Sequence, residues 1–388
     1  MRIVITGGGT GGHTSAGLAV AAALRARSDV ELHWIGSAAG VEGRRAPEAG
    51  IRFHPIQSGK LRRYRDRRNA TDLAFRVPVG IAQSWVALRR LRPALLFATG
   101  GFVSLPPVLA AWALGIPIVV HEQTSVPGLA NRIAARLARR IAVTFPSSGD
   151  EFPAERVTLT GNPIRPELLG GSREDGCRRF GLDPGIPIVY VTGGSLGSHA
   201  INRTVGEALG ELLPICQLIH QSGNNPETGD LGWLAERRRA LPAALQARYA
   251  LVAHVGPELR DVFPAADLVV GRAGAGTVNE CCHLGRAAIY IPLPGARGDE
   301  QTRNARLVEA AGGATVIPQS ALTAAGLVGT VRSLLADRPA LFAMGERARS
   351  LAVPDAAERI ARVIFEIARD ARAGEPSPAS ARRKAEGQ

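Results

Sequence analysis

Lysine is almost missing from this 388-residue chain, which contains only Lys60 and Lys384. Arginine therefore carries nearly all of the positive charge, and the formal net charge at pH 7 is +13. A basic balance of this size favours anionic partners, such as phosphates, nucleic acid or an acidic membrane surface. A general preference for arginine and alanine would produce the same balance, so the charge alone identifies no function.

Cysteine is also scarce, and the spacing of the four cysteines excludes a disulfide framework or a zinc site. An adjacent pair on a helix does not provide the two-residue gap of a zinc-binding motif. We expect free thiols in a reducing cytoplasm. The N-terminus is interrupted too early by glycine to be a signal peptide. The four cysteines are Cys177, Cys216, Cys281 and Cys282.

A long uninterrupted apolar segment is absent. Residues 94–120 carry no charge, but Gly100, Gly101, Pro106, Pro107 and Pro117 divide them into a predicted strand, loop, helix and strand. The chain also lacks a GK[ST] phosphate loop and an Asp-x-Asp pair for a metal on a nucleotide diphosphate. We expect neither a transmembrane helix nor a metal cofactor.

Short apolar runs alternate with helical patterns, which predicts an α/β protein with parallel sheets. The runs are RIVIT, ELHWIG, ALLFATG, IPIVVHE, RIAVTF and VTLTG, and the pattern restarts with IPIVYVTGG, CQLIHQSG, ALVAHVG, ADLVVGRAG, AAIYIPLP and ATVIP. The sequence thus predicts two domains, residues 1–163 and 164–352. An amphipathic helix at 353–371 and a polar tail at 372–388, predicted to be disordered, follow.

Glycine-rich loops open both predicted domains. TGGGTGGH (6–13) and TGGSLGSH (192–199) each follow a strand, begin a helix and end in histidine, and TGGFVS (99–104) is a third such loop. Backbone N–H groups at a helix start favour phosphate. Gly7, Gly9 and Gly12 also have the dinucleotide-binding spacing, but no acidic residue ends the second strand. A nicotinamide-dependent oxidoreductase is therefore the second interpretation.

The stretch GRAGAGTVNE places Glu280 on a helix after a further glycine turn. A carboxylate there can accept hydrogen bonds from the two vicinal hydroxyls of a ribose. Without the glycine turn before it, a surface glutamate would be the default interpretation. Gln301 and Asn304 suit sugar hydroxyls or cap a helix. Arg165, at the junction of the halves, either neutralises a diphosphate or forms an interdomain salt bridge.

Taken together, GGGTGGH, TGGFVS, HEQTSVPGLANR, GNPIR, GGSLGS, RAGAGTVNE and DEQTRNA occur in an order that resembles one family. It is the bacterial undecaprenyldiphospho-muramoylpentapeptide β-N-acetylglucosaminyltransferases, and the resemblance covers most of the chain. It implies two Rossmann-like domains facing across a cleft (the GT-B fold), with the last helix returning to the first domain. The implied reaction is an inverting, metal-independent transfer of N-acetylglucosamine from UDP-GlcNAc to the muramoyl 4-hydroxyl of lipid I, which forms lipid II.

The resemblance also implies site residues. Gly256 corresponds to a backbone contact to uracil, Glu280 to the ribose contact, and Gly100, Gly101 and Ser104 to an acceptor loop. Three positions depart from the family: Thr124 replaces an asparagine that contacts the sugar, Ala273 replaces a serine, and HTSAG lacks the usual proline. The remaining implied substrate contacts are Thr10, Gly11, Gly12, Arg165, Ser195, Ala275, Gly276, Thr277, Val278, Asn279 and Gln301.

His13 ends the first glycine loop, where we expect the diphosphate of the lipid acceptor to bind. A histidine beside a turn is more often structural, but this position favours a general base for the acceptor hydroxyl. Glu122 of the HEQ motif is the alternative, either relaying the proton or replacing His13.

A lipid-linked acceptor implies peripheral docking on an anionic membrane, at its cytoplasmic face. The predicted surface combines Phe75, Trp85 and Trp112 with a basic run; a solvated loop followed by a helix with a buried tryptophan is the alternative. Two further functional alternatives stay open: transfer to another glycolipid, and nucleic-acid binding, for which recognisable motifs are absent. The basic run comprises Lys60, Arg62, Arg63, Arg65, Arg67 and Arg68.

Overall fold

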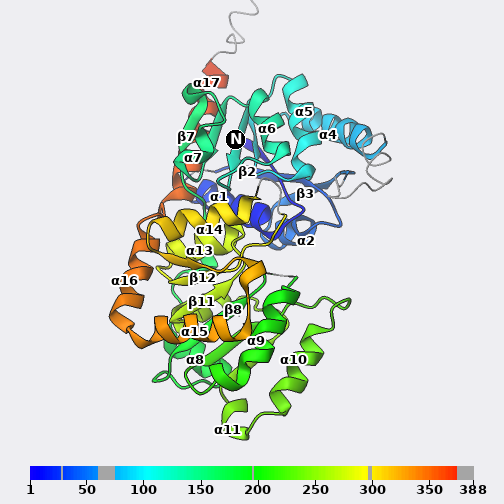
Figure 1. Ribbon diagram of the computed structural model, residues 1–388. Coiled ribbons are helices and arrows are strands. Elements are labelled where there is room, and N and C mark those ends of the chain that lie inside the picture. The colour runs from blue at the N-terminus through cyan, green and yellow to red at the C-terminus, as the bar shows by residue number, and fades with distance from the viewer. Residues whose placement is uncertain (28, 60–74, 195, 296–298, 374–388) are drawn as a thin grey trace, which may run out of the picture. The chain divides into compact units, whose positions relative to one another are not determined.

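The computed structural model describes residues 1–27, 29–59, 75–194, 196–295 and 299–373 (Figure 1). The chain divides into two compact units. Unit 1 comprises Met1–Pro163 with Asp355–Gln388, and unit 2 comprises Ile164–Pro354. The basic run at 60–68 and residues 374–388 of the tail lie outside the described residues.

Unit 1 is built on a seven-stranded parallel sheet in the order β3-β2-β1-β4-β5-β6-β7. The sequence predicts all of these strands except β3, a four-residue edge strand with no buried residue. The strands are β1 (Arg2–Thr6), β2 (Glu31–Gly36), β3 (Arg52–Pro55), β4 (Leu95–Ala98), β5 (Ile118–Glu122), β6 (Arg140–Val143) and β7 (Val157–Leu159). The helices are α1 (Gly11–Arg27), α2 (Val41–Glu48), α4 (Val77–Leu91), η2 (Phe102–Ser104), α5 (Leu105–Ala113), α6 (Leu129–Leu137), α7 (Pro146–Gly149), η3 (Ala154–Arg156) and α17 (Ala356–Ala373).

Alternation of side chains along each strand of unit 1 supplies two apolar faces. Ile3 and Ile5 of β1 face a core formed with α1 and α17, whereas Val4 faces a second core formed with α4, α5 and α6. Both faces of the sheet are therefore covered. The predicted division of residues 94–120 into strand, loop, helix and strand is confirmed.

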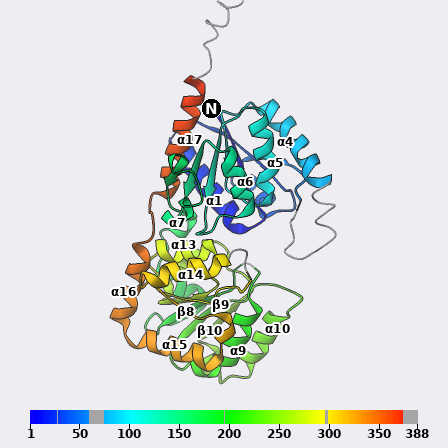
Figure 2. The same ribbon diagram turned by 45° about the horizontal axis from the view of Figure 1, so that its top comes forward.

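Helix α17 belongs to unit 1 although it follows unit 2 in the chain, as the resemblance implies. It contacts α1, β4 and β6, and α17 and α1 are labelled in Figure 2. Ile360, Ile364 and Ile367 recur at helical spacing and are buried in the core shared with α1. Arg27 of α1 also forms a salt bridge with Glu358 at 2.5 Å.

Unit 2 repeats the design with a six-stranded parallel sheet in the order β10-β9-β8-β11-β12-β13. All six strands coincide with the predicted runs, so the expectation of two Rossmann-like domains is confirmed. The strands are β8 (Ile188–Thr192), β9 (Gln217–Gln221), β10 (Tyr249–Val252), β11 (Leu268–Gly271), β12 (Ala288–Tyr290) and β13 (Ala314–Val316). The helices are η4 (Pro166–Leu168), α8 (Arg173–Phe180), α9 (His199–Leu212), α10 (Asp230–Arg239), α11 (Ala243–Gln246), α12 (Leu259–Ala265), α13 (Ala275–His283), α14 (Glu300–Ala310), η6 (Gln319–Ala321), α15 (Ala324–Ala336) and α16 (Arg338–Arg349).

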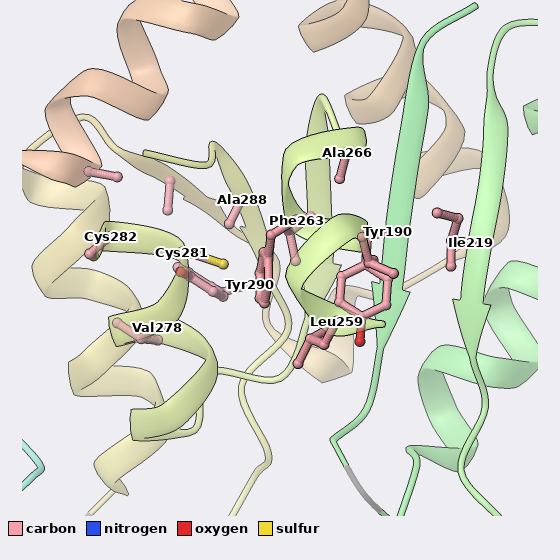
Figure 3. Close-up of a cluster of buried hydrophobic side chains, with 14 of the residues drawn as sticks. Tyr190, Ile219, Leu259, Phe263, Ala266, Val278, Cys281, Cys282, Ala288 and Tyr290 are labelled. Atoms are coloured by element: carbon pink, nitrogen blue, oxygen red, sulfur yellow. The ribbon is translucent and has the colours of Figure 1, made fainter. Parts of the chain in front are cut away.

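The two faces of this sheet are also both buried. Val189 and Val191 of β8 pack with α9, α15 and α16, and Tyr190 packs on the opposite face with α12 and α13. Figure 3 shows the second core, in which the Tyr190 and Phe263 rings meet edge to face at a centroid distance of 5.8 Å. All four cysteines are free and buried.

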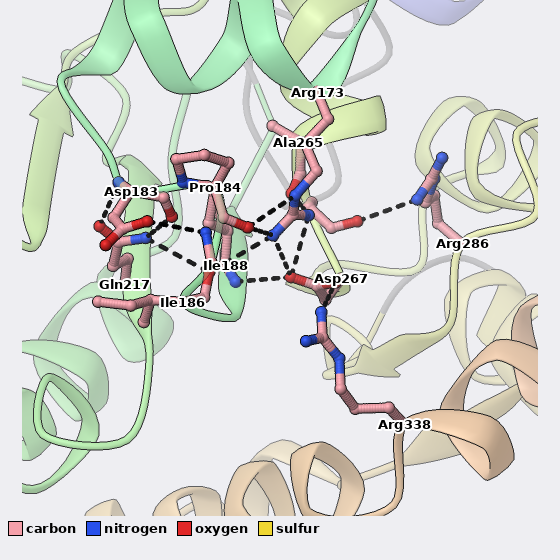
Figure 4. A network of polar contacts seen from close by, with 12 residues as sticks. Arg173, Asp183, Pro184, Ile186, Ile188, Gln217, Ala265, Asp267, Arg286 and Arg338 are labelled. Carbon is pink, nitrogen blue, oxygen red and sulfur yellow. Dashed lines mark hydrogen bonds and ion pairs between the residues drawn. The ribbon is translucent and has the colours of Figure 1, made fainter.

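Asp267, immediately before β11, ties together several elements of unit 2 (Figure 4). Its Oδ2 accepts from Arg173 at 3.1 Å and from the backbone N–H of Ile188 at 2.8 Å, and its Oδ1 accepts from Arg338 at 3.2 Å. One carboxylate thus joins α8, the start of β8 and α16. Asp267 lies at the amino ends of the strands, whereas the glycine loops lie at their carboxyl ends.

Candidate active site

The glycine loops lie where the strand order of each sheet reverses. In unit 1 the chain first adds strands on one side of β1 and then places β4 on the other, and in unit 2 β8 and β11 flank the corresponding point. At such a point, the connections from two neighbouring strands run to opposite sides of the sheet. A crevice forms outside the carboxyl ends of these strands, and α/β sheets bind their ligands there. The glycine loops that follow β1 and β4 share one such point, and those that follow β8 and β11 share the other.

In unit 1 the two loops are packed directly on each other. The backbone N–H of Gly8 donates to the Gly100 carbonyl at 3.3 Å. A Cβ at Gly7 would overlap the Thr99 hydroxyl, and one at Gly101 would overlap the Gly8 carbonyl. Gly100 and Gly101 also have φ of 101° and 81°, where side chains are disfavoured. Glycine is therefore required here for close backbone approach.

His13 lies in the first turn of α1 and is half-buried. Its Nδ1 is 2.7 Å from the Thr99 carbonyl oxygen, and since a carbonyl can only accept, Nδ1 carries the proton. Nε2 then carries the lone pair. Burial lowers the pKa of His13 below its ordinary value of 6.5, with the Thr99 hydrogen bond opposing the shift. A neutral imidazole with a free Nε2 lone pair is the form that can accept a proton.

Glu122, the alternative base, ends β5 and is buried. Its carboxylate accepts from the Thr124 hydroxyl at 2.8 Å, the Thr124 N–H at 3.0 Å, the Asn131 amide at 2.8 Å and the Gly128 N–H at 3.3 Å. Burial raises the pKa of Glu122, and these donors oppose the shift. The carboxylate therefore organises the loop from Thr124 to Asn131. The Val126 carbonyl oxygen, 2.7 Å from the Thr124 hydroxyl, is the alternative acceptor of its single hydrogen.

Asn131 is a polar residue of this site that sequence reasoning did not single out. Its Nδ2 donates to Glu122 and to the His121 carbonyl, while its buried Oδ1 has no hydrogen-bond partner in the described parts of the chain. A Cβ at Gly100 would lie 3.0 Å from both the Asn131 amide and the His13 ring. Asn131 and His13 thus flank Gly100. The HEQTSVPGLANR motif contains Asn131 and was the sequence signal that could have identified this residue.

The other predicted residues of unit 1 differ in accessibility. Thr10 and Gly11 are exposed at the start of α1 and Gly12 is half-buried, so this backbone is open to a ligand. Ser104 is buried, and its hydroxyl donates to the Gly101 carbonyl at 2.7 Å. Ser104 thus stabilises the conformation of the acceptor loop through a hydrogen bond inside that loop.

In unit 2, Gln221 connects two predicted donor-binding segments. Its Nε2 donates to the Gly194 carbonyl at 2.9 Å, and its Oε1 accepts from the Val255 N–H at 2.9 Å. The GGSLGS loop and the backbone beside Gly256 are therefore held by one buried side chain, whose role was not predicted. Ser195 lies outside the described residues.

Arg165 and Glu280, both in unit 2, form a salt bridge of 2.9 Å between Nη2 and Oε1. Burial raises the pKa of Glu280, and Arg165 opposes the shift. Nε of Arg165 is buried and has no acceptor among the residues that the structure describes. A buried guanidinium N–H without an acceptor is a position where an anion would be stabilised.

The remaining residues of the 275–280 segment differ in burial according to the side of α13 on which they lie. Ala275, Gly276 and Thr277 are half-buried at the start of α13. Val278 packs in the core, and Asn279 donates back to the Ala275 carbonyl at 2.7 Å, so their side chains serve the helix itself. Gln301 accepts from the Leu293 N–H at 3.0 Å, and Asn304 is buried and donates to the Ala273 carbonyl at 3.3 Å.

The two histidines that end the similar loops have different surroundings. His13 contacts the neighbouring Thr99 loop, whereas the side chain of His199 is 55% exposed and bonds to Asp230 at 2.8 Å. The sequence similarity thus reflects the same strand–turn–helix unit, and only His13 lies against a second glycine loop.

Comparison with known proteins identifies the family and the relatives that this chain resembles. Residues 3–143 match the glycosyltransferase family 28 N-terminal domain, and residues 188–360 match the C-terminal domain of that family. The UDP-N-acetylglucosamine–N-acetylmuramyl-(pentapeptide) pyrophosphoryl-undecaprenol N-acetylglucosamine transferase of Nocardioides sp. is 39% identical, over 95% of this chain and 98% of that protein. The transferase of the same name from Clostridium kluyveri is 37% identical, over 94% and 98% of the two chains.

Among solved structures, the crystal structure of Acinetobacter baumannii MurG is similar, with a TM-score of 0.70 and 27% identity over 94% of this chain and 99% of that one. The similarity to the named transferases extends over both units, and the matched segments contain the loops of both strand-order reversals. The chain therefore belongs to glycosyltransferase family 28 and, within it, to the N-acetylglucosamine transferases that these relatives represent.

Proposed function

We propose that this protein transfers N-acetylglucosamine from UDP-N-acetylglucosamine to the muramoyl 4-hydroxyl of lipid I, forming lipid II for peptidoglycan. The observation that carries the proposal is the near full-length relationship to transferases named for these substrates. In this chain, the glycine loops at the two strand-order reversals and a neutral His13 provide groups suited to this reaction.

Unit 2 binds the donor in this proposal. Glu280 accepts hydrogen bonds from the ribose hydroxyls, and Arg165 binds the diphosphate through the side chain whose Nε has no acceptor among the described residues. The backbone beside Gly256, held through Gln221, contacts uracil. The donor therefore replaces the Arg165–Glu280 salt bridge with contacts to both partners.

Unit 1 binds the acceptor, and His13 is the general base. As the muramoyl 4-hydroxyl attacks the anomeric carbon from the face opposite UDP, its proton moves to Nε2 of His13. The new glycosidic bond forms, the bond from the anomeric carbon to the diphosphate breaks, and UDP leaves with the bonding electrons. Arg165 and the helix N-termini stabilise the leaving diphosphate in this proposal, without a metal ion.

Membrane access requires a docking surface, which we propose lies on unit 1. Phe75, Val79 and Val86 on and beside α4, and Trp112 on the adjacent α5, are exposed apolar side chains. Trp85, which we expected among them, is half-buried and packs against the core that contains Leu88 of the same helix. No helix in the described ranges has the length and apolar character needed to cross a bilayer. We propose peripheral docking at the cytoplasmic membrane face.

A transfer assay tests the reaction. Radiolabelled UDP-N-acetylglucosamine is supplied with lipid I and, in parallel, with other glycolipid acceptors. Label appearing in lipid II supports the proposal, whereas selective labelling of another acceptor would reassign the substrate. Flotation with neutral and anionic vesicles tests docking: Phe75→Ser with Trp112→Ser should reduce binding, and unchanged binding would exclude this surface.

A further inference from the structure

Glu42 is a fully buried carboxylate whose role the proposed reaction leaves unexplained. It lies in the first turn of α2, and its exposed fraction is 0%. Buried carboxylates are unfavourable unless they are paired or hydrogen-bonded. Oε2 of Glu42 accepts from the backbone N–H of Gly9 at 3.1 Å, and Oε1 accepts from the N–H of Ser37 at 3.2 Å. Glu42 therefore joins the loop after β1 to the loop after β2.

Three glycines surround this carboxylate. A Cβ at Gly8 or at Gly40 would overlap the carboxyl group, and a Cβ at Gly36 would lie 2.8 Å from Cγ of Glu42. Gly40 has φ of −82° and ψ of 168°, which any residue can adopt. Its lack of a side chain is thus required by the space that Glu42 occupies.

The contact with Gly9 determines how the first glycine loop presents its backbone. Gly9 has φ of +77°, and its N–H is directed at Glu42 and so is unavailable to a phosphate. The exposed backbone of Thr10 and Gly11 follows directly. On the other side, Gly8 bonds to Gly100. The loop is therefore held between Glu42 and the Thr99–Gly101 segment that also contacts His13.

We propose that Glu42 is a positioning residue that holds the first glycine loop, so that the backbone at Thr10–Gly12 receives the acceptor diphosphate and His13 meets the acceptor hydroxyl. This inference rests on the proposed function of the loop. Glu42 acts through two backbone N–H groups and does not contact the substrate. Both carboxyl oxygens of Glu42 are hydrogen-bonded to backbone N–H groups inside unit 1.

Glu42→Gln tests the inference, because glutamine keeps the size but offers one oxygen and places an amide donor against the second N–H. Displacement of a substrate-positioning loop lowers rates by about 10- to 100-fold. We expect kcat/KM for lipid I to fall by about that factor while the Kd for UDP stays unchanged. Glu48→Gln is the matched control, since Glu48 lies on the same helix, is 61% exposed and pairs with Arg44. The control should behave as wild type.

Gly40→Ala supplies an independent test, because its Cβ displaces the carboxylate. It should lower kcat/KM in the wild-type background and have little further effect in a Glu42→Ala background. Additive losses would show that Gly40 acts separately and would overturn the inference. Wild-type kinetics for Glu42→Gln, or its loss of UDP binding together with global unfolding, would also overturn it.

Amide hydrogen exchange separates this inference from the proposed reaction. Peptides covering residues 7–13 and 35–42 should exchange faster in Glu42→Gln than in Glu48→Gln, with unit 2 unchanged. Because this measurement needs no turnover, failure of the wild type to use lipid I would reject the proposed function alone. Unchanged exchange in these peptides would reject the role of Glu42.

Discussion

The guanidinium of Arg165 donates to the carboxylate of Glu280 at 2.9 Å, across 115 positions of sequence. Each residue is assigned to a different part of the donor, so the pair keeps two oppositely charged side chains neutralised before the donor binds. Breaking one partner leaves the other partly buried and unpaired, which is costly. The donor can compensate only if it contacts both residues.

Glu280→Ala should therefore weaken UDP binding by about 1–3 kcal/mol, the usual effect of losing a buried, charge-assisted hydrogen bond. Titration calorimetry measures the change. Glu346→Gln is the control, because Glu346 forms an exposed pair with Arg349 in the same unit. Equal binding of NADH and UDP by the wild type would instead favour the oxidoreductase interpretation.

His13→Ala should lower kcat by about 10²- to 10⁴-fold, as expected for loss of a general base. The fold should persist, because the His13 ring makes two local polar contacts, with the Thr99 carbonyl at 2.7 Å and the Gln123 amide at 3.2 Å. Since burial lowers the pKa of His13 from 6.5, the wild-type rate should be maximal at neutral pH and fall only below pH 6.5. A variant that turns over normally, or that unfolds, would contradict this assignment.

Transfer should not require a divalent cation, because Arg165 and the helix ends are assigned to the leaving diphosphate. Activity measured after EDTA treatment should equal that of the untreated enzyme. Loss of activity that Mg²⁺ or Mn²⁺ restores would show that a metal ion carries part of this charge.

Two buried histidines should make the protein sensitive to acid. Burial lowers the pKa of His121 in unit 1 to about 4 and that of His220 in unit 2 to about 3. The unfolded chain takes up these protons near pH 6.5 and the folded chain does not. The stability contributed by the neutral histidines is therefore present above pH 6.5 and is lost as the pH falls toward 4 and 3.

Urea denaturation at pH 7.5 and pH 5 measures this dependence. The free energy of unfolding should be lower at pH 5, and His220→Gln should reduce the difference between the two conditions. The same difference in wild type and variant would assign the acid sensitivity to other groups.

Asp267→Asn should lower the free energy of unfolding of unit 2 by about 1–3 kcal/mol, because its carboxylate accepts hydrogen bonds from two arginines and a backbone N–H. Urea denaturation followed by hydrogen exchange of peptides from residues 164–354 reports on this unit. Glu346→Gln, which removes an exposed pair, should change stability by less than about 0.5 kcal/mol. Similar effects of the two substitutions would show that Asp267 is not a connecting residue.

The layered fold and the positions of the loops were predictable from the sequence alone. Strands buried on both faces appear as short apolar runs, and glycines at their ends mark turns, because both signals depend on neighbours in the chain. The sequence did not predict β3, because this half-exposed edge strand contains a single large apolar residue, Phe53, and so has no apolar run.

The roles of individual polar side chains were not predictable from the sequence and depend on contacts between distant segments. Glu42 reaches Gly9 across 33 positions, and Glu122 receives four donors and so braces a loop. Asn131 lies beside His13 only because β1, β4 and β5 are neighbours in the sheet. Hydrogen bonds between distant segments depend on strand order and close backbone approach, and periodicity along the chain carries no information about either.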